Sequence, residues 1–294
     1  MAIPGVVLIG DRINPGFKST REMIETDDYE ALQGLALRQQ DAGAAYLDFT
    51  IGPRARDDKE FLTKSIQAVQ EAVDIPLCFD DPAFAIQEHC LNAYDADKAG
   101  GEKAMINSIS ETRWELLDLL KICPLKFIMM SSERVEDGVG MQNKSVPDMV
   151  DTVKRMTKKI LASGYDIEID DLIVDVAIGT LASDTEGLTR NSLDTIKTIG
   201  SAPELKGIHM SAGMTNLSTQ LPVMKIDDQP LKLSLENAFL TLAVPAGFDM
   251  MLTTPWKDYH LLDDDNRVFQ AFQEIIALDG LDALRRLRKL YKSQ

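Results

Sequence analysis

Short aliphatic runs alternate with longer segments of helical periodicity along the whole chain, and this alternation constrains the fold more than any other feature. There are eight such runs: Val6–Ile9, Ala45–Phe49, Pro76–Phe79, Ala104–Ile106, Phe127–Met130, Leu172–Val174, Gly207–Met210 and Phe248–Leu252. Spread over 294 residues, this is one unit per roughly 37 residues, which is close to the size of a strand-plus-helix unit. The pattern predicts eight parallel strands.

The segments between these runs have the apolar stripe of helices that pack one face on a sheet. After Pro147, apolar residues recur every three or four positions as far as Ile160, with lysines between them. No linker or shift in composition divides the chain, so we expect residues 1–294 to form one (β/α)8 barrel domain. A doubly wound sheet is the alternative, because periodicity alone does not show that a sheet closes. The longest irregular stretches, Ser131–Ser145 and Gly213–Pro230, both follow strands.

The chain is acidic. It has 31 Lys and Arg against 47 Asp and Glu, a net charge of −16, which repels nucleic acid and anionic membrane surfaces. The three cysteines, Cys78, Cys90 and Cys123, have no CxxC spacing, which argues against a disulfide framework and a structural zinc. No run approaches the roughly 18 apolar residues that a membrane span needs, and the apolar start has no basic leader. These features predict a cytoplasmic protein.

Polar residues close four of the predicted strands at corresponding positions: Asp48, Asp80, Asn107 and Asp175. Any one of them could simply cap a helix or form a turn. In a barrel, however, the carboxyl ends of all strands meet at one rim, where active sites lie. The coincidence on four strands therefore predicts a binding site.

The sequence lacks the residue patterns that several other kinds of site require. The three histidines are scattered, Lys126 and Lys206 fall at strand beginnings, and no GxGxxG follows a strand. This argues against zinc, Schiff-base and dinucleotide sites. Carboxylates and amides suit a neutral ring that presents an amino group beside ring N–H and carbonyl positions, such as a pterin.

A series of motifs in this order resembles the pterin-binding methyltransferases, which exchange a methyl group between methyltetrahydrofolate and a corrinoid protein. The motifs are Asp11-Arg12-Ile13-Asn14, Leu47-Asp48-x-x-x-Gly52-Pro53, Leu77-Cys78-x-Asp80, Ala104-Met105-Ile106-Asn107-Ser108 and Gly213-x-x-Asn216-x-Ser218. The family includes the methyltransferase components of anaerobic O-demethylases and the folate domain of cobalamin-dependent methionine synthase. The resemblance covers essentially the whole chain.

The resemblance implies a TIM barrel of the dihydropteroate-synthase type, usually a homodimer, with folate in its C-terminal mouth. It implies that Asp80, Asn107 and Asp175 hold the pterin edge, and that Asn216 reaches the N5 atom of the folate. Asp48 would belong to the same polar network, and catalysis would depend on Asn216, Asp48 and Asp175. The other implied substrate-binding residues are Asp11, Asn14, Gly213, Thr215 and Ser218.

The same resemblance implies that tetrahydrofolate and 5-methyltetrahydrofolate are substrates and that no metal is bound. The cobalamin would come from a separate corrinoid protein, because no histidine lies in an Asp-x-His-x-x-Gly motif. We expect methyl transfer to tetrahydrofolate during catabolic demethylation of the O-demethylase type. The Ser131–Ser145 stretch is a candidate contact for the corrinoid protein, and a plain surface loop is the alternative.

Three other functions remain open. One is dihydropteroate synthase, although the segment Thr215–Ser218 lacks the basic residues that this enzyme needs. Another is a metal-dependent lyase or isomerase, with Asp48, Asp80, Asp175 and Asp249 as Mg²⁺ ligands. The last is a folate-binding protein without catalytic activity.

Overall fold

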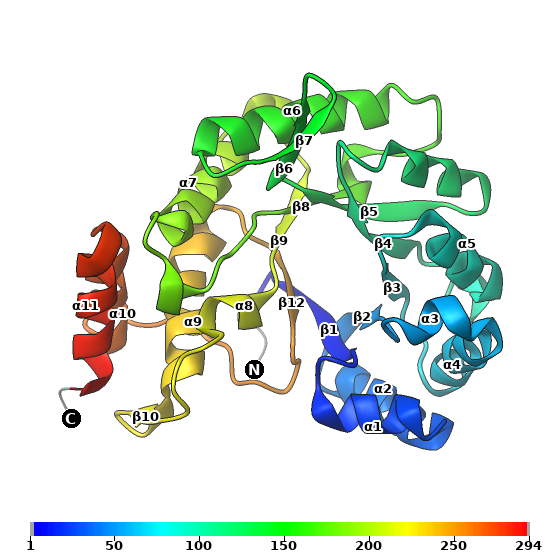
Figure 1. Cartoon of the computed structure of the whole chain (residues 1–294), viewed down its shortest axis with the longest axis horizontal. Helices are drawn as coiled ribbons and strands as arrows, with labels where there is room; N and C mark the ends of the chain where they lie inside the picture. The colour runs from blue at the N-terminus through cyan, green and yellow to red at the C-terminus, as the bar shows by residue number, and fades with distance from the viewer. Residues whose placement is uncertain (1–2, 293–294) are drawn as a thin grey trace.

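The computed structural model describes residues 3–292 and contains eight parallel strands that form a nearly closed barrel (Figure 1). The strands are β1 (Val7–Ile13), β2 (Ala44–Phe49), β3 (Leu77–Asp80), β4 (Ala104–Ile109), β5 (Leu125–Met130), β8 (Leu172–Asp175), β9 (His209–Ser211) and β12 (Met250–Thr253). They are ordered β12-β1-β2-β3-β4-β5-β8-β9. Each of the eight predicted runs overlaps one of these strands, which confirms the (β/α)8 prediction.

The barrel closes between β9 and β12. The backbone N–H of Leu252 donates to the carbonyl oxygen of Ala212 at 3.0 Å, and a parallel bridge joins Leu252 to Gly213. On its other side, β12 pairs with β1 over four residues, from Val7 to Gly10. Because β12 has neighbours on both sides, the sheet is not the open, doubly wound alternative.

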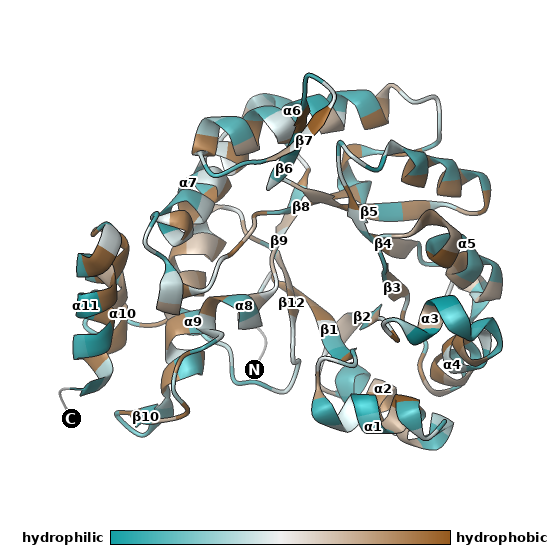
Figure 2. Ribbon diagram, viewed as in Figure 1, coloured by the Kyte–Doolittle hydropathy of each residue, from teal (hydrophilic) through white to brown (hydrophobic). Residues whose placement is uncertain are grey.

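Helices surround the barrel and present alternating hydrophilic and hydrophobic bands (Figure 2). They are α1 (Lys18–Glu25), α2 (Tyr29–Asp41), α3 (Arg54–Asp57), α4 (Lys59–Ala72), α5 (Phe84–Ala93), α6 (Val146–Leu161), α7 (Leu188–Gly200), α8 (Met214–Ser218), α9 (Leu231–Ala243), α10 (Arg267–Ile276) and α11 (Gly280–Lys292). Between β4 and β5 the connection is a 3-10 helix, η2 (Trp114–Lys121). Asp28 and Ser145 cap α2 and α6 by accepting backbone N–H groups. None of the helices within residues 3–292 is long and apolar enough to cross a membrane.

The barrel interior has an apolar floor to which seven of the strands contribute one buried residue each. These residues are Ile9, Tyr46, Cys78, Met105, Ile128, Ile173 and Met250. They form a cluster separate from the main core. Side chains of a strand alternate between the two faces of a sheet, so the residue two positions after each floor residue also points into the barrel, one layer closer to the C-terminal mouth.

Two hairpins lie within the stretches that the sequence predicts as irregular, so that prediction was wrong in part. Strands β6 (Glu133–Glu136) and β7 (Val139–Gln142) form one hairpin, and β10 (Lys225–Ile226) and β11 (Gln229–Pro230) form the other. Asp137 and Gly138 join β6 to β7 with φ of 51° and 79°. An Asp-Gly pair in this left-handed region is the usual two-residue hairpin turn.

Candidate functional site

Strand register explains why the predicted site residues meet. Asp11, Asp48, Asp80, Asn107 and Asp175 each stand two positions after a floor residue of their strand. We call these five residues the polar layer. Asp80 pairs directly with Asn107 across β3 and β4. The structure therefore gathers the predicted strand-end residues inside the barrel at its mouth.

Asp48 is the most deeply buried member of the polar layer, with no exposed surface. Its Oδ1 accepts a hydrogen bond from Asn107 Nδ2 at 3.3 Å, whereas its Oδ2 is buried and has no hydrogen-bond partner among the residues described. Burial, together with repulsion from Asp80, raises the pKa of Asp48 well above its ordinary value. A buried oxygen without a donor costs free energy, so this atom is suited to accept from a ligand.

Asp80 has a raised pKa of about 6, because it is buried and lies near the charge of Asp81. Arg113 acts in the opposite direction and lowers this pKa. The Arg113 guanidinium forms its ion pair with another residue, since its Nη2 donates to Glu133 Oε1 at 3.0 Å. The carboxyl group of Asp80 can therefore change charge near neutral pH when a ligand supplies hydrogen-bond donors.

Asp175 and Asp11 complete the polar layer on β8 and β1. Burial raises the pKa of Asp175, although its Oδ1 accepts the backbone N–H of Ala177 at 2.7 Å. Burial also raises the pKa of Asp11, whose Oδ1 accepts a hydrogen bond from Thr254 Oγ1 at 3.2 Å. All four carboxyl groups of the layer thus have pKa values shifted toward the neutral form.

A residue that sequence reasoning missed supports the layer from outside. Gln87 of α5 is fully buried, and its Nε2 donates to the carbonyl oxygens of Phe79, Asp81 and Asn107 at 2.9, 2.8 and 3.3 Å. These bonds fix the backbone at the ends of β3 and β4. The sequence signal that could have identified Gln87 is a glutamine on the helix face that packs against the sheet.

The segment after β9 forms the short helix α8, which carries Asn216 at the mouth. The Asn216 side chain is exposed and has no hydrogen-bond partner in the described part of the chain. It folds over Gly213, where a Cβ atom would approach Asn216 Nδ2 to 3.0 Å. The structure brings Asn216 to the same end of the barrel as the polar layer, but no hydrogen bond joins it to Asp48 or Asp175.

Three other predicted residues have local partners. Asn14 Oδ1 accepts the backbone N–H of Gly16 at 2.8 Å and so forms a turn after β1. Ser218 is buried, and its hydroxyl group donates to Glu236 Oε1 at 2.6 Å. Thr215 is partly buried on α8, and its carbonyl oxygen accepts from Thr219 Oγ1 at 2.9 Å. Their implied contacts with folate remain predictions.

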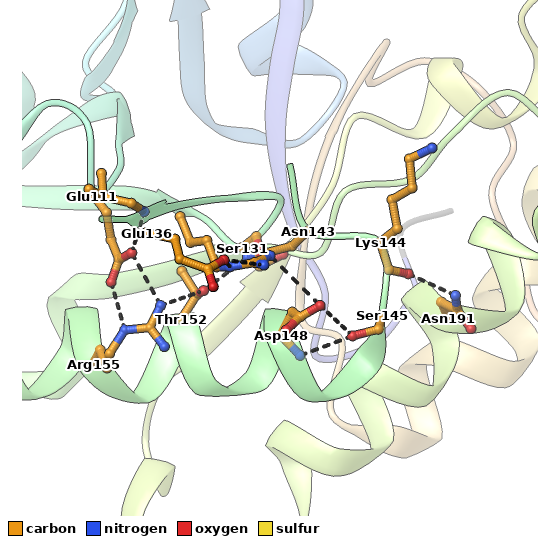
Figure 3. A network of polar contacts seen from close by, with 12 residues as sticks. Glu111, Ser131, Glu136, Asn143, Lys144, Ser145, Asp148, Thr152, Arg155 and Asn191 are labelled. Carbon is orange, nitrogen blue, oxygen red and sulfur yellow. Dashed lines mark hydrogen bonds and ion pairs between the residues drawn. The ribbon is translucent and has the colours of Figure 1, made fainter. Parts of the chain in front are cut away.

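The β6–β7 hairpin beside the mouth is anchored at its base, as Figure 3 shows. Asn143 Nδ2 donates to Thr152 Oγ1 of α6 at 2.9 Å. Glu111 accepts the backbone N–H of Val135 at 2.8 Å and also pairs with Arg155 of α6, Nε to Oε1, at 2.9 Å. The hairpin is therefore a structured element rather than a plain loop.

Asp249, one of the four Mg²⁺ ligands in the lyase or isomerase alternative, lies at the N-terminal end of the barrel. Asp249 precedes β12, and its Oδ2 pairs with His209 Nδ1 at 2.7 Å. It cannot share an ion with Asp48, Asp80 and Asp175 at the mouth, so the ligand set as expected from the sequence is wrong. Within residues 3–292, no group of three or more His, Cys, Asp or Glu side chains is arranged to hold a metal ion.

The arrangement favours a neutral, donor-rich ligand. The polar layer offers carboxyl and amide oxygens as acceptors. The raised pKa values of its carboxyl groups mean that uncompensated negative charge is disfavoured there. An anionic ligand would meet repulsion there, whereas paired N–H donors stabilise the ionised carboxylates.

Comparisons with known proteins agree with this chemistry. A family described as pterin binding enzyme matches residues 13–253. A methylcorrinoid:tetrahydrofolate methyltransferase from Eubacterium limosum is 24% identical over 256 residues, which cover 85% of each protein. A dihydropteroate synthase from Clostridium difficile has a similar fold, with TM-score 0.59, 16% identity and 98% and 97% of the two chains covered. For that of Xanthomonas albilineans with 7,8-dihydropteroate, the values are 0.57, 14%, 99% and 96%. The chain belongs to the family of pterin-binding enzymes.

Proposed function

We propose that this enzyme transfers a methyl group from a methylated corrinoid protein to N5 of tetrahydrofolate, as the catabolic, O-demethylase type of pathway requires. The observation that carries the proposal is the polar layer, in which a buried Asp48 oxygen beside Asp80 and Asn107 has no donor from residues 3–292. A pterin ring presents an amino group and ring N–H in parallel, which is the donor pattern that such carboxylates accept. The name of the Eubacterium limosum relative supports the choice of reaction.

In the mechanism, Asp80, Asn107 and Asp175 orient the pterin, and Asp48 supports Asn107 through their hydrogen bond. The N5 lone pair attacks the methyl group, the carbon–cobalt bond breaks with its electron pair left on cobalt, and N5 then gives its proton to water. The Asn216 amide at the mouth has no partner among residues 3–292, so its Oδ1 can accept a hydrogen bond from N5–H as positive charge develops there. Because burial raises the pKa values of Asp48 and Asp175, their ionised carboxylates are more basic than usual and can help to stabilise that positive charge.

The methyl donor is a separate corrinoid protein, and we propose that the β6–β7 hairpin contacts it. Val139 and Met141 lie on the same face of the hairpin and are 59% and 45% exposed. Exposed apolar side chains on an anchored element near the site are typical of a recognition surface. We further propose a cytoplasmic homodimer, and the three free cysteines are consistent with a reducing compartment.

The test is methyl transfer between free methylcobalamin and tetrahydrofolate, measured in both directions. We expect 5-methyltetrahydrofolate to form. We expect Asn216→Ala to lower the rate by about 10²- to 10³-fold while folate still binds, because one hydrogen-bond partner of a developing charge is lost. A wild-type enzyme that binds folate but never transfers methyl would overturn the proposal. An Asn216→Ala rate within about twofold of wild type would remove its assigned role.

The hairpin contact has its own experiment. Val139→Asp and Met141→Asp should raise KM for the methylated corrinoid protein roughly tenfold, because an apolar contact becomes charged. Transfer from free methylcobalamin should not change, since that donor needs no protein contact. Leu281→Asp is a matched control, because Leu281 is also exposed but lies on α11. Equal KM values for all three variants would refute the contact.

Dihydropteroate synthase is the second candidate because solved enzymes of that name have this fold. Between Gly213 and Pro230, the one basic residue is Lys225, which is exposed on β10. Formation of dihydropteroate from a pterin pyrophosphate and aminobenzoate would favour this function over methyl transfer.

A further inference from the structure

Another buried carboxylate, which does not belong to the polar layer, contacts the helix α8. Glu236 of α9 has no exposed surface. It accepts three donors: Ser218 Oγ at 2.6 Å, Lys257 Nζ at 2.9 Å and Tyr259 OH at 2.8 Å. Ser218 ends α8, two residues after Asn216. The carboxylate therefore joins α8 to α9 and to the segment that follows β12.

These contacts form a closed network. The Tyr259 hydroxyl also lies 2.5 Å from Thr253 Oγ1, on the last residue of β12. Burial and the charge of Glu236 both raise the pKa of Tyr259, so its proton stays in the network. A buried charge is stable only when it is paired and hydrogen-bonded, and both Glu236 oxygens meet this condition.

The helix α8 depends on contacts outside itself. It has five residues, too few to be stable alone. Met214 and Leu217 pack in the core, and the Ser218 hydroxyl is the α8 side-chain group that Glu236 holds. Because the Asn216 amide has no hydrogen-bond partner in the described chain, its position depends on where the backbone of α8 lies.

We infer that Glu236 is a positioning residue, which acts through Ser218 to hold Asn216 at the mouth. The catalytic consequence rests on the proposed function, but the positioning itself does not. Loss of the Ser218 hydroxyl leaves the groups of Asp80 and Asn107 in place, so folate affinity should change little. The rate of methyl transfer should fall, because Asn216 no longer has a fixed position relative to N5.

The first test is hydrogen–deuterium exchange of residues 213–220 in the free protein. We expect Ser218→Ala to speed exchange in this segment roughly tenfold, because a hydrogen bond to a charged group is lost. Ser234→Ala is the matched control: Ser234 is a buried serine of the same helix as Glu236, but its hydroxyl donates to Pro230 at the start of that helix. Unchanged exchange in Ser218→Ala would overturn the inference, whatever the enzyme catalyses.

The second test separates kcat from folate binding. We expect Ser218→Ala to lower kcat about tenfold and to change the Kd for tetrahydrofolate less than twofold. A Kd that rises as much as kcat falls would overturn the inference, since Ser218 would then contact folate directly.

A double variant, Glu236→Gln with Lys257→Met, removes both charges but keeps a side-chain oxygen that can accept from Ser218. This double variant should recover most of the kcat that the single variant Glu236→Gln loses. Failure of this rescue in a folded protein would also count against Glu236. A wild-type protein without transfer activity would refute the proposed function and leave the exchange test standing.

Discussion

The two ends of the barrel carry similar residues in opposite states. At the N-terminal end, three cationic side chains lie in ion pairs: Lys103 Nζ with Asp171 at 2.6 Å, Lys126 Nζ with Asp170 at 3.2 Å, and His209 with Asp249 at 2.7 Å. At the mouth, burial and the charges of Asp80 and Asp11 raise the pKa of Asp48, whose Oδ2 has no donor among the described residues.

The pKa shifts follow this difference. A hydrogen bond from Lys126 lowers the pKa of Asp170, whereas burial raises the pKa of Asp48, Asp80 and Asp175. Paired groups stabilise the fold, and unpaired buried ones are stabilised by a ligand instead. The N-terminal end is therefore structural, and we propose that the mouth is functional.

The largest expected effect concerns Asp80. Asp80→Ala should weaken tetrahydrofolate binding roughly a hundredfold, because two charge-assisted hydrogen bonds are lost. Its Tm at pH 8 should stay the same or rise, since the ionised, buried carboxylate destabilises the fold above pH about 6. Titration calorimetry and thermal unfolding measure the two quantities. Unchanged affinity for tetrahydrofolate, or a large drop in Tm, would contradict the proposed difference between the two ends of the barrel.

Asp249 is the corresponding change at the paired end. Asp249→Asn should lower the free energy of unfolding by about 1–2 kcal/mol, because the contact with His209 and the bond from the Met210 N–H at 2.9 Å both weaken. Methyl transfer and folate affinity should match wild type. Denaturant unfolding and the transfer assay check these outcomes, and a loss of affinity would show that this end also serves the site.

The smallest effect is a pH dependence of stability at His209. Its pKa is raised above 6.5 by the hydrogen bond with Asp249, with a further contribution from Asp170. The stabilisation is therefore complete below pH about 6.5 and is lost as pH rises through the raised value. We expect the Tm difference between wild type and His209→Gln to shrink between pH 6 and pH 8. A difference independent of pH would show that His209 is not charged in the fold.

The alternation of aliphatic runs with helical segments predicted the strands well, because the strands of a parallel barrel are buried on both faces and therefore appear as continuous apolar runs. It failed where a residue's role depends on which end of a strand it occupies: Asp249 precedes β12, whereas Asp175 ends β8. The hairpin after β5 was missed despite its Asp137-Gly138 turn.

Residues that act through the backbone of distant elements were also missed. Gln87 bonds carbonyl groups of two strands, and Glu236 joins three elements that lie close together only after folding. In the sequence, each is simply one polar residue in a helix. Only the structure shows what these side chains contact.

The central claim is that the carboxyl groups of the mouth are held toward the neutral form until a pterin supplies donors. Calorimetric titration of tetrahydrofolate at pH 6, in two buffers of different ionisation enthalpy, measures the protons released on binding. Because burial raises the pKa of Asp80 to about 6, its ionisation on binding should release a measurable fraction of a proton per site, and Asp80→Asn should abolish that part. Binding without proton release, with the same affinity in Asp80→Asn, would contradict the account.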